Sequence, residues 1–358
     1  MGGAATDRAE FTRRVAITIA MVLTAGLLLI FIFKTASVLL MLFGAMLLAV
    51  FFDGVATFIA GRTPLPRLAA LGVFVVLFLG GFVVLFWAIG PQVAAQVTVL
   101  AELLPDALDR GVSALQHYSW GRSLLSRFPE PGNIASLSPE LVGPLTRFFS
   151  GTATVVLNVI VVLALGIYFA IAPQTYVKGL LRLVPPGGRT RGGEVAAALG
   201  HVLRRWIAGR LASMFVVGVL TVVGLLLAGV PLALTLGLIA ALASFVPYIG
   251  PVLGAVPAIL VALSNDPVKA LYVVLVFAVV QILENYLITP QIDQKAVSLP
   301  PALLIGVQIL MGVLIGAGGV LMATPLLVVV ILLVQMLYLQ GVFNEPVRLL
   351  GTTKRTGS

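Results

Sequence analysis

The sequence predicts an all-α polytopic membrane protein with about eight membrane segments. The chain has 358 residues, of which 60% are hydrophobic and only 10% are charged, whereas about a quarter of an average soluble domain is charged. Its apolar residues gather in runs long enough to cross a bilayer, which takes about 20 residues. Two runs in the C-terminal half are longer than a span needs and are interrupted by proline and glycine. We expect these two runs to be re-entrant or proline-broken hairpins.

Residues 1–90 are expected to form an N-terminal cytoplasmic tail and the first three spans. The first span, Val15–Phe33, follows three arginines and is longer than the apolar core of a cleaved signal peptide. The second and third spans are Val38–Ala60 and Leu68–Gly90, joined by the basic turn GRTPLPR at residues 61–67.

Residues 91–147 are the one substantial polar region. Apolar residues recur there at roughly helical spacing, from Val93 to Leu115, and basic and acidic residues nearly balance. This pattern predicts an extracytoplasmic amphipathic helical region that lies on the membrane or against the spans.

Residues 148–358 begin with a fourth span, Phe148–Ala172, a basic loop at residues 176–210 and a fifth span, Leu211–Gly229. Since cytoplasmic loops carry an excess of lysine and arginine, the basic segments and both termini are expected on the cytoplasmic side. A second interpretation of the basic loop is that it recruits a partner or anionic lipid, as in a membrane scaffold or regulator.

Residues 231–263 and 300–337 are the two broken segments, separated by the span Val268–Ile288. Half-lengths of about 15 residues are too short to cross a bilayer, but two of them can form a hairpin. Because exposed backbone is tolerated at membrane depth only inside protein or along a cavity, such breaks predict a transport site. The alternative is two long, tilted, kinked helices. The residues expected to shape the breaks are Pro247, Gly250, Pro251, Gly254 and Pro257 in the first, and Gly316, Gly318, Gly319 and Pro325 in the second.

Two acids fall within predicted spans, and such groups are candidates for function because burying them is costly. Glu284 lies among amides and suits cation coordination, proton relay or a hydrogen bond to a polar solute; pairing with Lys295 is the structural alternative. For Asp53, close to Arg62, an interfacial or structural role is favoured. The candidate solute- or ion-binding residues are Glu284, Asn285, Gln281, Gln291, Tyr248 and Gln308.

Enzyme signatures are missing from the sequence. The chain has no cysteine and two histidines, which lie in different segments, and the glycine-rich stretch at residues 187–194 lacks the lysine and Ser/Thr of a phosphate-binding loop. We therefore expect no enzyme, no metal site and no cofactor beyond a coupled proton or sodium ion. The net charge of +9 fits basic cytoplasmic segments, and no nucleic-acid partner is expected.

Three stretches together resemble the AI-2E family of bacterial transporters. They are SFVPYIGPVLGAVPA (Ser244–Ala258), QILENYLITPQI (Gln281–Ile292) and the proline- and glycine-rich run Leu299–Leu327. The resemblance covers nearly the whole chain and implies a secondary transporter of the bacterial inner membrane, assembled as a homo-oligomer, with a pentamer as the first guess. One branch of the family exports the small polar quorum-sensing signal autoinducer-2, and others look like sodium or lithium/proton antiporters. Export of a small polar solute by alternating access is the favoured expectation.

Overall fold

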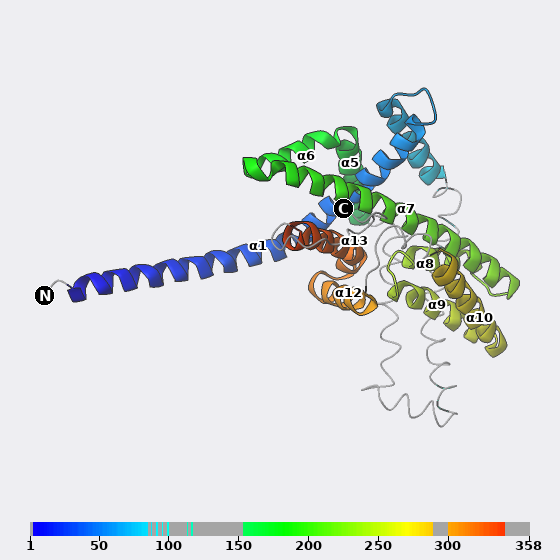
Figure 1. The fold of residues 1–358 in the computed structure, drawn as a ribbon. Coiled ribbons are helices and arrows are strands. Elements are labelled where there is room, and N and C mark those ends of the chain that lie inside the picture. Colours follow the sequence, from blue (N-terminus) through cyan, green and yellow to red (C-terminus); the bar gives the residue numbers. More distant parts are fainter. Residues whose placement is uncertain are drawn as a thin grey trace.

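The computed structural model describes residues 3–84, 153–288 and 300–340, together with single positions between 87 and 116. Every regular element in these residues is a helix, and no strand occurs among them, as the sequence predicts. The helices pack around α7 (Arg189–Leu227), the long helix that runs across the molecule in Figure 1. Among the described residues, five helices are long and apolar enough to cross a membrane, or six if the bent pair α5–α6 is one span. A multi-pass membrane protein is thus supported, but the expected count of about eight segments is not confirmed.

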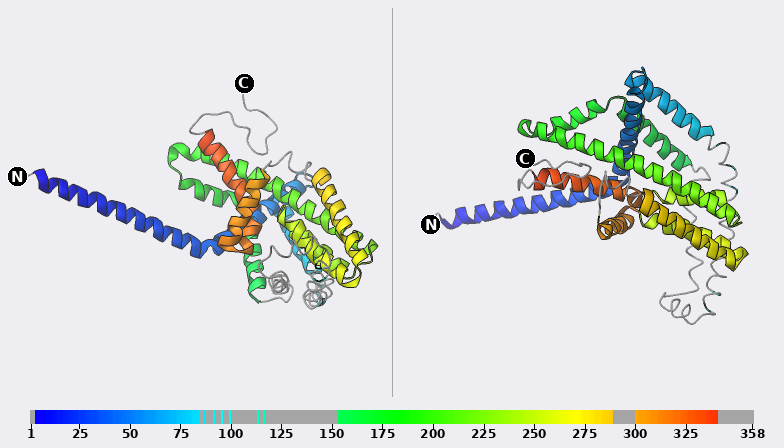
Figure 2. Two further views of the ribbon diagram at one scale, coloured as in Figure 1. Left: turned by 90° about the horizontal axis from the view of Figure 1, so that it is seen from below. Right: turned by 45° about the vertical axis from the view of Figure 1, so that its right-hand side comes forward.

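The N-terminal helix, α1 (Gly3–Ala60), is continuous where the sequence analysis placed two spans, Val15–Phe33 and Val38–Ala60. Residues 34–37, Lys-Thr-Ala-Ser, contain neither proline nor glycine, so nothing ends the helix there. In Figure 2 the N-terminal part of α1 projects from the bundle and the C-terminal part runs into it. The prediction of two separate spans was wrong, and counting two crossings before the turn at residues 61–66 no longer supports the assigned sidedness.

The helix Arg67–Val84 and α5 (Ala153–Ile171) pack beside the C-terminal half of α1. Phe51 and Phe52 of α1 meet two phenylalanines of the helix Arg67–Val84 with ring centroids 5.4–6.3 Å apart. Most of these pairs are edge-to-face, an arrangement that aromatic quadrupoles favour. This packing places the N-terminal end of the helix Arg67–Val84 next to the C-terminal end of α5, and both lie near the basic residues of α7.

The predicted basic loop at residues 176–210 is helical. α6 (Pro173–Arg182) leads through a 3-10 turn at Pro186–Gly188 into α7, which continues unbroken to Leu227. The connection that the sequence analysis placed between the fourth and fifth spans is thus mostly helix, and its cytoplasmic location stays a prediction. No proline occurs between residues 189 and 227. Each glycine there destabilises the helix by only about 1 kcal/mol relative to alanine, so the helix continues. The predicted fifth span is the second half of α7.

The first broken segment changes direction where the sequence predicts. α8 (Ala233–Ala243) and α9 (Ile249–Asn265) are separated by residues 244–248 and pack against each other, so the chain folds back at the break. α9 in turn packs on α10 (Pro267–Leu283), whose first turn is capped by the Asp266 carboxylate. The alternative of one long kinked helix does not describe this segment.

The second broken segment has the same plan. α12 (Pro301–Ile315) and α13 (Ala317–Leu333) are separated by Gly316 alone, whose φ of 79° lies in the left-handed region that glycine adopts readily. α13 then passes into a π-helical turn at Val334–Leu339. α8 and α12, with 11 and 15 residues, are shorter than the roughly 20 residues of a span. Re-entry of these helix pairs into a membrane stays a prediction.

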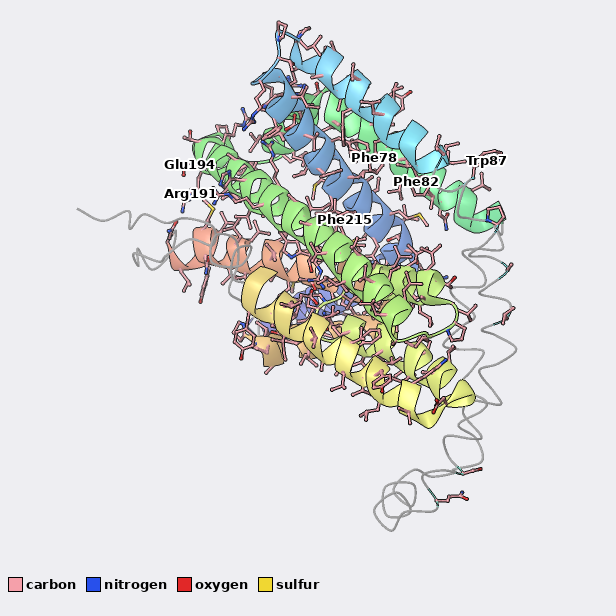
Figure 3. The ribbon with its side chains drawn as sticks, turned by 90° about the vertical axis from the view of Figure 1, so that its right-hand side faces the viewer. Phe78, Phe82, Trp87, Arg191, Glu194 and Phe215 are labelled. Carbon is pink, nitrogen blue, oxygen red and sulfur yellow. The ribbon has the colours of Figure 1, made fainter. Side chains whose placement is uncertain are left out.

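Apolar side chains fill the inside of the bundle and also cover its outside. Leu47, Trp206 and Leu332 belong to a buried cluster that joins α1, α7 and α13. Phe215 is 73% exposed and Trp87 is 81% exposed; Figure 3 labels both. Large exposed apolar side chains of this kind suit contact with lipid.

Several predictions fall on residues that the structure does not describe. They are the amphipathic character of residues 91–147, apart from single positions there, and the placement of Gln291, Lys295 and the tail after Gln340. These stay predictions.

Candidate functional site

Glu284 is buried at the junction of α10 and a π-helical turn, Glu284–Ile288, with 5% of its surface exposed. Ser213 Oγ of α7 donates a hydrogen bond to Glu284 Oε1 at 2.7 Å, and Gln281 Nε2 lies 3.3 Å from Glu284 Oε2. Single π-turns occur frequently at functional sites, and a buried carboxylate in a membrane protein is a functional candidate by default. The structure therefore brings Glu284 and Gln281 together as the sequence analysis expected.

Arg210 of α7 connects this carboxylate to the first break. Its Nη1 lies 3.6 Å from Glu284 Oε1, and its Nε donates to the Phe245 carbonyl at 3.0 Å. The Arg210 side chain is only 14% exposed. The Arg210 guanidinium thus contacts both the Glu284 carboxylate and the Phe245 carbonyl. The Phe245 carbonyl has no helical hydrogen bond because the helix is broken between α8 and α9.

The other predicted polar residues near Glu284 divide into two groups. Asn285 is exposed, and its Oδ1 lies 3.4 Å from Gln281 Nε2, so it belongs to the edge of the same cluster. Gln291 and Lys295 lie outside the described residues. Among the described residues, the partners of Glu284 are Ser213, Arg210 and Gln281, and pairing with Lys295 stays a prediction.

Tyr248 occupies a strained turn at the first break. Its φ of 64° and ψ of −50°, with a hydrogen bond of 2.8 Å from Ile249 N–H to the Pro247 carbonyl, are the geometry of a classic γ-turn, which is rare and strained. A bulky residue at positive φ is an outlier that points to a functional constraint. Tyr248 is half exposed.

Gln308 joins the second broken segment to the first. The residue is fully buried on α12, and its Nε2 donates to the Pro247 carbonyl at 3.1 Å. Pro247 O therefore accepts bonds from both the γ-turn and the other helix pair. Gln308 Oε1 is buried without a hydrogen-bond partner among the described residues, and an unsatisfied buried acceptor costs about 1–3 kcal/mol. The structure thus leaves one acceptor of this buried amide without a donor.

Two of the predicted break residues allow α8 and α9 to approach. A Cβ at Gly250 would lie 2.1 Å from the Ala243 carbonyl oxygen, and one at Gly254 would lie 2.9 Å from the Ala240 Cα. Pro251 sits in the first turn of α9, where its missing N–H would have no helical partner in any case.

The outcome at the second segment is similar, and two prolines are exceptions. Gly316 makes the break, and Gly318 and Gly319 start α13, where a Cβ at Gly319 would lie 2.3 Å from the Met311 carbonyl oxygen. Pro257 and Pro325 lie inside continuous helices, α9 and α13, so listing them among the break residues was wrong. A helix can continue through proline when packing offsets the lost hydrogen bond, and Pro325 is buried.

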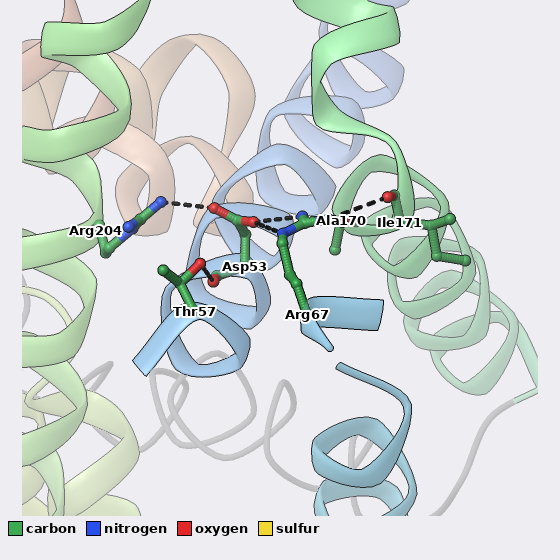
Figure 4. A network of polar contacts seen from close by, with 6 residues as sticks. All are labelled: Asp53, Thr57, Arg67, Ala170, Ile171 and Arg204. Carbon is green, nitrogen blue, oxygen red and sulfur yellow. Dashed lines mark hydrogen bonds and ion pairs between the residues drawn. The ribbon is translucent and has the colours of Figure 1, made fainter. Parts of the chain in front are cut away.

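Asp53 forms a separate network of ion pairs (Figure 4). One carboxylate oxygen accepts from Arg204 Nη2 of α7 at 2.6 Å, and the other accepts from Arg67, with Nε at 2.9 Å. Arg67 also donates to the carbonyls of Ala170 and Ile171 at the C-terminal end of α5. The structural role favoured from sequence fits this geometry, but the partners are Arg67 and Arg204; Arg62 lies 3.6 Å above the Phe58 ring.

Sequence reasoning missed Arg210 and Ser213. Arg210 was counted among the charges of a loop, and Ser213 was read as one small residue in an apolar span. The signal that could have found Arg210 is its place on the helix: an arginine followed directly by the apolar run from Leu211 is a charge at the edge of membrane depth.

A resident metal is not indicated in the part of the chain that the structure describes, because no group of three His, Asp or Glu side chains gathers there. What the site offers is a carboxylate, a guanidinium, a hydroxyl, amides and free backbone carbonyls. Such groups can hold a proton and bind hydroxyl or carbonyl groups of a solute.

Comparison with known proteins gives one family. The sequence model of the AI-2E family transporters matches residues 17–338. The chain is 28% identical over 278 residues to a Bacillus subtilis protein named "Putative transport protein YueF", covering 74% of this chain and 75% of that protein. It is 27% identical over 273 residues to "Putative transport protein YrrI" of the same organism, covering 73% and 76%. A Thermotoga maritima protein named "Putative transport protein" is 23% identical over 226 residues, covering 62% and 67%.

Proposed function

Because the chain belongs to the AI-2E family of transporters, it is a membrane transporter rather than an enzyme, and we propose that it exports a small polar solute, such as autoinducer-2, by secondary transport. Access alternates around the polar groups that run from Glu284 through Arg210 and the first break to Gln308. A proton bound and released by Glu284 couples the movement to a gradient.

One observation carries this proposal: the break between α8 and α9 is held by side chains from two other elements. Arg210 of α7 binds the Phe245 carbonyl, and Gln308 of α12 binds the Pro247 carbonyl, two residues farther on. In this proposal the break moves between two arrangements, one with these bonds made and one with them released. Transporters use such broken helices near the membrane midplane to form their sites.

Glu284 supplies the coupling in this proposal. While Glu284 is ionised, it attracts Arg210 and accepts from Ser213. When it is protonated, the attraction of Arg210 to the carboxylate is lost, and the guanidinium can turn to the break or to a solute. Solute hydroxyl groups would donate to Gln308 Oε1 and to the amide oxygens of Gln281 and Asn285.

Sodium/proton antiport is the second candidate, and Glu284 with its neighbouring amide oxygens favours it. The Arg210 guanidinium 3.6 Å from Glu284 Oε1 counts against it, because a cation bound there would face a like charge. A scaffold or regulator without transport is the third candidate.

The proposal also includes the sidedness and the assembly of the protein. Both termini lie in the cytoplasm, and several copies of the chain form a homo-oligomer.

The experiment is flux into and out of proteoliposomes that hold the purified protein, with autoinducer-2 and sodium followed separately. Wild type is compared with Glu284→Gln, with and without an imposed proton gradient. The matched control is Glu194→Gln, which changes an acid on α7 whose side chain is 55% exposed. Gradient-dependent autoinducer-2 flux that is lost only in Glu284→Gln supports the proposal. Sodium flux with counter-flowing protons would instead establish antiport, and absence of both fluxes in a folded wild-type protein would contradict this choice of solute.

A further inference from the structure

A short amphipathic helix, α6, leaves the apolar helix α5 at a sharp angle. The bend between Leu157–Ile171 and Pro173–Arg182 is 84°. If α5 crosses the membrane near its normal, α6 lies close to the membrane plane. With 10 residues α6 is about 15 Å long, too short to cross a bilayer.

α6 is fixed to the protein along one side only. Val177 and Leu181 of α6, and Val184 two residues after its end, are partly buried at i, i+4 and i+7, the spacing of one helix face. The packing is close: a Cβ at Gly192 of α7 would lie 2.8 Å from Leu181 Cδ2. This side orients the helix and leaves its remaining surface free of contacts with α7.

A second apolar face of α6 is exposed. Tyr176 and Leu180 of α6, and Leu183 at its C-cap, have the same spacing and are 43%, 66% and 82% exposed. The Tyr176 ring touches Phe169 of α5, 4.7 Å between centroids, so this face begins at the end of the spanning helix. Three large apolar side chains in a row that continue from a membrane span are positioned for lipid rather than for water.

The opposite side of α6 is basic. Lys178 and Arg182, four residues apart, are exposed and have no partner among the described residues, and α6 contains no acid. Arg189 follows across the 3-10 turn. A basic face opposite an apolar face is the pattern of a helix that lies in the interface of a membrane with anionic lipid.

We propose that α6 is an interfacial helix that binds the anionic phospholipids of one leaflet. Tyr176, Leu180 and Leu183 enter the acyl boundary, and Lys178 and Arg182 reach the phosphates of neighbouring headgroups. Charge complementarity selects this occupant over a second copy of the chain, since the same basic faces of two copies would repel each other. The inference does not rest on the proposed transport function.

The first test measures depth. Because the chain has no cysteine, Leu180→Cys, Leu183→Cys and Lys178→Cys each give one site for a nitroxide. In vesicles of phosphatidylglycerol and phosphatidylcholine, Leu180 and Leu183 are expected to be quenched by oxygen and shielded from a nickel chelate, with the reverse at Lys178. Phe215→Cys, on the outer surface of α7, serves as the lipid-facing reference. Water exposure at both leucines, or dipolar broadening between two labelled copies, would overturn the proposal.

The second test measures lipid choice with spin-labelled phosphatidylglycerol and phosphatidylcholine. Lys178→Gln with Arg182→Gln should lower the preference for phosphatidylglycerol by about fivefold for each charge that touches the headgroups. Lys178→Arg with Arg182→Lys keeps the charge and should keep the preference. An unchanged preference in the neutralised variant, which keeps the packed face of α6 and should fold normally, would equally overturn the proposal.

Discussion

The two acids within predicted spans, Asp53 and Glu284, are both paired with arginines of α7, yet their environments differ. Asp53 accepts from two guanidiniums, Arg67 and Arg204, at hydrogen-bond distance. Glu284 has one guanidinium at 3.6 Å and accepts its short hydrogen bond from the neutral Ser213. The Glu284 side chain is also less exposed, at 6% against 18% for Asp53.

The difference teaches which acid can change partners. Arg67 is held by two carbonyls of α5 as well as by Asp53, so the Asp53 network joins four helices in one fixed arrangement. Arg210 is instead divided between Glu284 and a carbonyl of a strained break. We infer that Asp53 is an anchor, because its charge is compensated twice, and that Glu284 is the group whose charge state can move the structure.

The largest effect is expected from Asp53→Asn. It leaves Arg67 and Arg204 without their anion, and breaking a buried ion pair costs about 3–5 kcal/mol, less where water reaches the group, as at this carboxylate. We predict a marked fall in the unfolding temperature in detergent and in the yield of monodisperse protein. Asp266→Asn is the control, because asparagine can cap α10 as aspartate does. Equal unfolding temperatures for the two variants would remove the anchor role.

Glu284→Gln should lower the unfolding temperature less than Asp53→Asn, because Arg210 keeps its bond to the Phe245 carbonyl, and should have a large effect on transport. The glutamine oxygen can still accept from Ser213, whereas the charge that attracts Arg210 is gone. Gradient-dependent flux should fall about tenfold or more, which corresponds to a loss of about 1.4 kcal/mol or more in coupling. An unfolding temperature that drops as far as in Asp53→Asn would make Glu284 a second anchor and end the distinction.

Gln308→Ala should have an intermediate effect on both properties. It removes one of the two hydrogen bonds to the Pro247 carbonyl, which should lower the free energy of unfolding by about 1 kcal/mol. It also removes the Oε1 acceptor that has no partner among the described residues. Flux should decline several-fold while the unfolding temperature falls modestly. Thr324→Val on α13 is the matched control, since the Thr324 hydroxyl is buried without a hydrogen-bond partner in the described part of the chain and its removal should preserve flux. If both variants lose flux equally, contact between the two broken segments is not what matters.

The smallest effect is expected from Tyr248→Gly. Glycine adopts positive φ readily, so this substitution should relieve strain and raise the free energy of unfolding by up to about 1 kcal/mol. Tyr272→Gly, in the middle of α10 with a similar exposure, should lower it by about the same amount. Thermal unfolding of the two variants shows whether each change raises or lowers the free energy of unfolding. A destabilised Tyr248→Gly would mean that contacts of the tyrosine ring outweigh the strain of the turn.

Much of this arrangement follows from local sequence. Proline and glycine clusters at residues 246–251 and at Gly316 break helices through missing N–H groups and positive φ, so both breaks were predictable. It was harder to predict where a helix continues. Both α1 and α7 run through polar or charged residues without a break, because neither helix contains a proline there. Pro257 and Pro325 show the converse, because tertiary packing can carry a helix through a proline.

Only the part of the candidate site that lies within one helix could be predicted from the sequence. Glu284 and Gln281 share one helix turn, so their proximity can be seen in the sequence. Arg210 and Ser213 come from another helix, and the contact of Gln308 with Pro247 spans 61 residues. Such contacts depend on how the helices pack, which hydrophobic runs alone do not specify.

The most direct test of the central claim compares Glu284→Gln and Asp53→Asn in the same proteoliposome experiment, with flux normalised to the amount of folded protein. We predict that Glu284→Gln reconstitutes like wild type but loses the response to the proton gradient. Asp53→Asn should reconstitute poorly, while the folded fraction keeps that response. A gradient response that survives in Glu284→Gln and disappears in folded Asp53→Asn would contradict the account.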